Sequence, residues 1–102
     1  MKKAVVMTMR WDGVTPEQYE MIRNMVRWEE NTPDGACLHV ASFEGGALHV
    51  TDVWESQAAF EPFFGDRLAV AVKEAGIEGE PRTDFRPLHR RFIAPGVTGA
   101  AG

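Results

Sequence analysis

The stretch LHVASFEGGALHVTDVW, residues 38–54, decides the fold because it has the pattern of a β-hairpin. Two runs rich in β-branched and aromatic residues flank Gly45 and Gly46, and glycine tolerates the positive φ angles of a two-residue hairpin turn. If these glycines form the whole loop, Glu44 pairs with Ala47 and the partner of every other residue follows. The stretch therefore predicts two antiparallel strands, over 36–44 and 47–55.

This register places His39 directly opposite Asp52, where an imidazole and a carboxylate are close enough to share a hydrogen bond. Paired residues project to one side of a sheet, so the same face carries the pairs Cys37–Trp54, Ala41–Val50 and Phe43–Leu48. The opposite face carries Leu38, Val40, Ser42, His49, Thr51 and Val53. A three-residue loop would instead shift the partners and could separate His39 from Asp52.

Two interpretations of the His39–Asp52 pair remain open. A carboxylate that fixes the imidazole tautomer leaves the other ring nitrogen as a general base. Alternatively, the pair is a satisfied polar contact within the sheet, because burying such groups is unfavourable unless they are paired. Cys37 on the same face suggests a third reading as a metal site, but the residues match no ligand spacing motif and we expect no metal.

The chain before the hairpin predicts a strand and a helix. Residues 3–11 are mostly apolar and include β-branched valines, which favours a strand. Thr15, Pro16 and Gln18 then provide an N-cap, a first-turn proline and a capping-box partner. Apolar residues recur at helical spacing from there until the segment 31–35, NTPDG, which is expected to end the helix.

A second helix is predicted over residues 57–76, with Ser56 as its N-cap. Pro62 and Gly65 lie inside this segment. Since proline removes a helical hydrogen bond and clashes with the preceding turn, we expect a kink near 62–65 and a restart capped by Asp66.

Residues 81–92 complete the pattern as a fourth strand, in which Pro87 favours an edge position. The order βαββαβ is that of a ferredoxin-like α+β fold, with a four-stranded antiparallel sheet and two helices on one face. We expect one domain over 1–93 and a loose tail over 94–102. The other face of the sheet needs a cover, and a second copy of the chain is the simplest one.

Composition limits the classes of partner. The net charge of −4 gives no reason to expect nucleic acid, although residues 86–92, RPLHRRF, are locally basic. Cys37 is the only cysteine, which excludes an internal disulfide, and no apolar run is long enough to span a membrane. A cytoplasmic location is the default expectation.

The segment 50–76, VTDVWESQAAFEPFFGDRLAVAVKEAG, resembles the dimeric α+β barrel superfamily, particularly its antibiotic-biosynthesis-monooxygenase-like branch. Its sharpest local feature is Trp54 followed by Glu55, Ser56 and Phe60. The resemblance implies a homodimer packed sheet on sheet, with a cleft between the sheet and helices of each subunit. Activities in the superfamily vary widely. Its haem-degrading members carry a histidine on the second helix, where this chain has phenylalanines.

Two functional hypotheses follow. The first is an enzyme of monooxygenase, cyclase or isomerase type that needs no cofactor and acts on an apolar, aromatic or polyketide-like molecule. His39 would be its general base, oriented by Asp52. The expected substrate-binding residues are Trp54, Tyr19, Cys37, Phe43, Val50, Phe60, Phe63, Phe64 and Leu68. The second hypothesis is a non-catalytic dimer that binds a small ligand or has a structural role.

Overall fold

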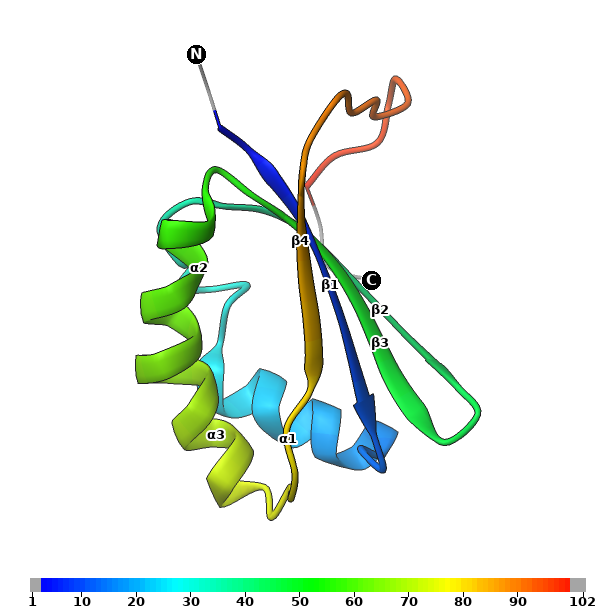
Figure 1. The fold of residues 1–102 in the computed structure, drawn as a ribbon, viewed down its shortest axis with the longest axis vertical. Coiled ribbons are helices and arrows are strands. Elements are labelled where there is room, and N and C mark those ends of the chain that lie inside the picture. Colours follow the sequence, from blue (N-terminus) through cyan, green and yellow to red (C-terminus); the bar gives the residue numbers. More distant parts are fainter. Residues whose placement is uncertain (1–2, 100–102) are drawn as a thin grey trace.

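The computed structural model describes residues 3–99 and contains the predicted βαββαβ order (Figure 1). All strand pairs are antiparallel, in the order β2-β3-β1-β4. Both helical segments lie on the same side of this sheet, which confirms the ferredoxin-like fold. The elements are β1 (Val5–Asp12), α1 (Pro16–Val26), β2 (Ala36–Glu44), β3 (Ala47–Trp54), α2 (Gln57–Pro62), the π-helix η1 (Phe63–Leu68), α3 (Ala69–Glu74) and β4 (Arg82–Pro87).

The helix α1 begins as predicted and ends earlier than predicted. The backbone N–H of Gln18 donates to the Thr15 hydroxyl, and the Gln18 side chain accepts from the Thr15 N–H, so the capping box is complete. Arg27 then adopts a left-handed conformation with φ 58° and ends the helix before the segment 31–35. The Arg67 guanidinium stabilises this end, since it donates to the carbonyls of Val26 and Asn31.

The second helical segment does not break and restart. Ser56 caps it through the Ala59 N–H, as predicted. Beyond Pro62, however, the chain continues directly into η1 and α3, so the predicted restart capped by Asp66 is wrong. A wider π-helical turn follows the proline, because this turn accommodates the missing helical hydrogen bond without a break in the helix.

The strand β4 is shorter than the predicted 81–92 and ends at Pro87. It pairs with β1 alone, so Pro87 lies on an edge strand as expected. Residues 94–99 contain neither helix nor strand, and residues 100–102 of the predicted tail lie outside the described residues. Within the described part of the chain, no helix is long and apolar enough to cross a membrane.

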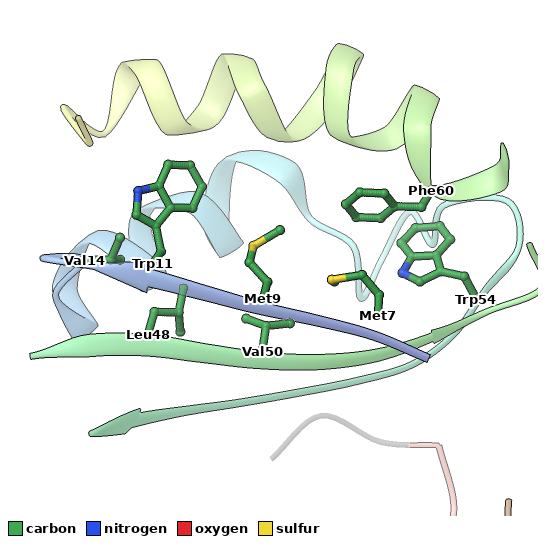
Figure 2. Packing of buried hydrophobic residues seen from close by; sticks show 8 residues of the cluster. All are labelled: Met7, Met9, Trp11, Val14, Leu48, Val50, Trp54 and Phe60. Carbon is green, nitrogen blue, oxygen red and sulfur yellow. The ribbon is translucent and has the colours of Figure 1, made fainter. Parts of the chain in front are cut away.

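The main core lies between the sheet and the second helical segment (Figure 2). Met7, Met9 and Trp11 on β1 face the helices. The other buried members are Val14, Leu48, Val50, Trp54 and Phe60. On the opposite face of the sheet, Leu38 and Val40 are 47% and 52% exposed, whereas their neighbour Val53 is 6% exposed, so part of this apolar face is open in a single copy of the chain.

Candidate functional site

The hairpin has the register that the two-glycine loop predicts. Gly45 and Gly46 take φ angles of 61° and 74°, and His39 lies opposite Asp52. The register fails at one place only. A β-bulge between Ala36 and Leu38 puts Ala36 opposite Trp54, so the predicted Cys37–Trp54 pair is wrong. Cys37 is exposed there.

His39 and Asp52 form a hydrogen bond of 2.8 Å between Nδ1 and Oδ1. Asp52 is only 5% exposed, whereas the His39 side chain is 32% exposed. The indole N–H of Trp54 donates to the second carboxylate oxygen at 3.0 Å. An ionised carboxylate only accepts hydrogen bonds, so the proton on neutral His39 belongs to Nδ1 and Nε2 is left as the base. Trp54 and His39 together satisfy the buried carboxylate.

The hydroxyl of Tyr19 lies 2.7 Å from His39 Nε2. Burial, with smaller contributions from the negative charges of Glu20 and Asp52, raises the pKa of Tyr19 to about 12. The phenol is therefore neutral at physiological pH and donates to Nε2 when the imidazole is neutral. The sequence pattern placed Tyr19 on a wall of the cleft and gave no sign of this hydrogen bond.

The site opens into a groove of about 930 Å³ that lies between the sheet and the helices and extends around the edge strand β2 to Leu38 and Val40. Of the nine predicted substrate-binding residues, Phe64 does not line it, and its ring packs against Phe60 at 5.6 Å between centroids. The other eight line the groove: Tyr19, Cys37, Phe43, Val50, Trp54, Phe60, Phe63 and Leu68. Aromatic and aliphatic side chains thus surround the polar pair, as in typical small-molecule sites.

Trp28 and Glu29 also line the groove, and sequence reasoning did not place them there. The Trp28 ring centroid lies 5.0 Å from that of His39. Trp28 lies beyond the end of α1, because the left-handed Arg27 turns the chain before it. Glu29 accepts two hydrogen bonds of 2.7 Å from Arg23, which hold the pKa of its carboxyl below the usual value.

The alternative metal site does not form. Among residues 3–99, no three His, Cys, Asp or Glu side chains are grouped so that they could hold a metal ion. The β-bulge explains why Cys37 does not join His39 and Asp52, since it takes Cys37 out of the regular alternation of the strand.

No protein-family model and no curated protein matches the sequence. Solved structures do match the fold. SnoaB, a cofactor-independent oxygenase of Streptomyces nogalater, has a TM-score of 0.66 and 10% identity, and the match covers 90% of this chain and 99% of SnoaB. A monooxygenase of Streptomyces coelicolor in complex with nanaomycin D has a TM-score of 0.59 and 20% identity, with coverage of 91% and 93%.

MupZ of Pseudomonas fluorescens has a TM-score of 0.63 and 12% identity, and the match covers 97% of this chain and 95% of MupZ. At such identities the similarity shows the fold alone. It agrees with the fold that the resemblance of residues 50–76 implied.

Proposed function

We propose that this chain is a cofactor-independent enzyme of monooxygenase, cyclase or isomerase type, in which His39 is the general base. The substrate class is apolar, aromatic or polyketide-like. The observation that carries the proposal is the Asp52–His39 hydrogen bond at the wall of a largely apolar groove. A structural polar pair would not need a groove of about 930 Å³ beside it.

The chemistry of the proposed step is a proton transfer. An acidic C–H or O–H of the substrate loses its proton, and the bonding electrons stay on the substrate as an enolate or phenolate. The proton ends on Nε2 of His39, and Asp52 stabilises the resulting imidazolium. Trp54 keeps Asp52 in place through its indole N–H. The resulting anion is the intermediate for cyclisation, isomerisation or reaction with oxygen.

Solved structures of the same fold support the substrate class. One is a cofactor-independent oxygenase and another holds nanaomycin D. The groove of this chain has aromatic side chains from several elements, among them Tyr19 of α1, Trp54 of β3 and Phe60 of α2. Flat aromatic ligands pack well against such walls.

The base is tested with anthrone, a carbon acid, in deuterated buffer under nitrogen. Deuterium uptake at its methylene group requires only that a proton is removed and a deuteron is added to the resulting anion. It requires no cyclisation, isomerisation or reaction with oxygen. We expect the wild-type protein to catalyse this exchange, and His39→Ala to lower the rate about 10²- to 10⁴-fold, the usual range for a general base. His89→Ala is the matched control, because His89 is exposed and lies outside the groove.

An unchanged exchange rate in His39→Ala would exclude His39 as the base. Anthrone binding can be monitored by the quenching of tryptophan fluorescence. If the wild-type protein binds anthrone but does not catalyse exchange, the result would instead favour the non-catalytic ligand-binding dimer. Circular dichroism of each variant shows whether the fold is intact.

The proposal includes a homodimer. Leu38 and Val40 are about half exposed on the sheet face opposite the helices. Exposed apolar faces of this kind mark interfaces. A second copy packed on this face would cover Leu38 and Val40 at the edge of the groove and would leave the part between the sheet and the helices open to substrate.

A further inference from the structure

We propose that Tyr19 is a second catalytic residue, whose phenol carries the substrate proton to His39. This inference rests on the proposed function, because it concerns how the proton reaches the base. The resulting chain runs from Tyr19 through His39 to Asp52, with Trp54 as the outer support of the carboxylate.

Both nitrogens of the His39 ring are occupied. Nδ1 is bonded to Asp52 at 2.8 Å, and Nε2 lies 2.7 Å from the Tyr19 hydroxyl. A substrate that approached Nε2 directly would have to displace the phenol and break this short hydrogen bond. Tyr19 itself lines the groove, so its phenol is within reach of a bound substrate.

The direction of the hydrogen bonds favours a relay. The Asp52 oxygens only accept, so neutral His39 donates through Nδ1 and accepts through Nε2. The Tyr19 hydroxyl is thus the donor to Nε2, and its oxygen keeps capacity to accept. The described residues provide no other hydrogen bond to this hydroxyl, so its free acceptor position is open to a substrate.

Packing holds the phenol in this position. The Tyr19 ring lies 5.8 Å from Trp28 and meets Phe43 edge-on at 6.2 Å between centroids. The Tyr19 and His39 rings are nearly parallel, with 8° between their planes. Neighbouring rings on two sides limit the freedom of the side chain, and such positioning is a requirement for efficient proton transfer.

The relay step balances without an oxidant. The substrate donates a proton to the Tyr19 oxygen while the Tyr19 proton moves to Nε2 of His39. The substrate becomes an anion, Tyr19 remains a neutral phenol, and His39 becomes an imidazolium beside Asp52. One bond to hydrogen breaks and one forms at the phenol oxygen, so Tyr19 is unchanged after the step.

The test is Tyr19→Phe in the anthrone exchange assay. This variant keeps the ring and its contacts and removes only the hydroxyl. A relay predicts a loss of about 10²-fold in exchange rate, within the range for a single proton-transfer group. Anthrone affinity, measured by quenching of tryptophan fluorescence, should stay within about twofold because the apolar walls are intact.

A rate in Tyr19→Phe equal to or above that of the wild type would overturn the relay, since it would mean that the phenol only blocks the base. His39→Ala separates this result from failure of the proposed function. If His39→Ala loses exchange while Tyr19→Phe keeps it, His39 acts directly. If His39→Ala keeps exchange, the proposed function itself is wrong.

A second measurement does not depend on removing the hydroxyl. Tyr19 is the only tyrosine in the chain, so growth on fluorotyrosine alters this phenol alone. Fluorine makes the phenol more acidic and changes the energy of both proton transfers. The relay predicts an exchange rate that changes with the acidity of the phenol, and a constant rate across mono- and difluorinated protein would contradict it.

Discussion

At the scale of single residues, the site depends on the carboxylate of Asp52. This group is 5% exposed, and burying an ionised carboxylate is costly unless its oxygens accept hydrogen bonds. His39 and Trp54 supply one donor to each oxygen. The same hydrogen bond therefore serves stability and chemistry. The N–H at Nδ1 of His39 satisfies Oδ1 of the buried carboxylate, and this bond also fixes the tautomer that leaves Nε2 as the base.

Titration of Tyr19 gives a residue-scale prediction. Burial disfavours the phenolate, so the folded-state pKa rises from 10.0 to about 12. Because the folded value is the higher one, this group's contribution to stability is complete below about pH 10 and is lost as the pH rises toward 12. Phenolate absorbance should show a midpoint near 12 in the native protein and near 10 in urea.

The single tyrosine makes this titration unambiguous. A native midpoint near 10 would show that the phenol is solvated and not held against His39. His39→Ala serves as a comparison, because it removes the hydrogen-bond partner and leaves the surrounding rings in place.

The sequence allowed the His39–Asp52 pair to be predicted because a hairpin register is a local property. Two glycines fix the turn, and the turn fixes every pair on either side of it. The Tyr19 hydroxyl could not be placed in this way. Its contact with His39 depends on how α1 packs against the sheet. Helical periodicity shows which face of the helix is apolar, but it does not give the distance of the helix from the sheet or its rotation about its own axis.

At the scale of elements, Gly35 joins the start of β2 to the second helical segment. It has φ +85°, and a Cβ added there would lie 2.6 Å from the Cβ of Ala59. Its carbonyl also accepts a hydrogen bond from the Glu55 N–H. Only a residue without a side chain allows α2 to approach the strand this closely.

Gly35→Ala should therefore destabilise the protein more than Gly46→Ala does. Both positions have positive φ, and this alone costs about 1–2 kcal/mol for a residue with a Cβ. At Gly46 the added methyl group meets nothing within 4 Å. The clash with Ala59 adds about 1–3 kcal/mol at Gly35. Urea unfolding of the two variants measures the difference.

A double variant, Gly35→Ala with Ala59→Gly, provides the control for this prediction. It removes the clash and should recover part of the lost free energy of unfolding. Equal stabilities of Gly35→Ala and Gly46→Ala would contradict the close approach of α2 to β2.

The element boundaries show where local signals are sufficient. The caps at Thr15 and Ser56 were predictable, since a capping side chain bonds to the backbone within three residues of itself. The end of α1 was not, because a distant segment contacts the residues on either side of Arg27. Arg67 reaches the carbonyls of that turn from 36 and 41 residues away in sequence.

At the scale of the whole molecule, the fold was predictable and the assembly remains a proposal. Four strand patterns and two helix patterns allow few arrangements, and the βαββαβ order selects the ferredoxin-like one. The predicted register also exposes one apolar sheet face. The surface that covers this face would belong to a second molecule, and the sequence of one chain does not show which molecule it is. The dimer therefore requires its own test.

Val40→Asp tests the dimer. A carboxylate placed on the open sheet face would be buried without a partner in a sheet-to-sheet dimer, which is strongly unfavourable. We expect sedimentation analysis to give twice the mass of one chain for the wild type and the mass of one chain for the variant. Val70→Asp is the control, since Val70 is 59% exposed on α3, away from the sheet.

A dimer that persists in Val40→Asp would show that the copies associate through another surface. A wild-type protein that sediments as a single chain at micromolar concentration would exclude the proposed dimer altogether.

The measurement that tests the central claim most directly is the ratio of anthrone exchange rates between the wild-type protein and His39→Ala under nitrogen. The claim is that the Asp52–His39 pair makes a general base in the groove. It predicts a ratio of about 10² or more. A ratio near one, or a wild-type rate no faster than buffer alone, would contradict it.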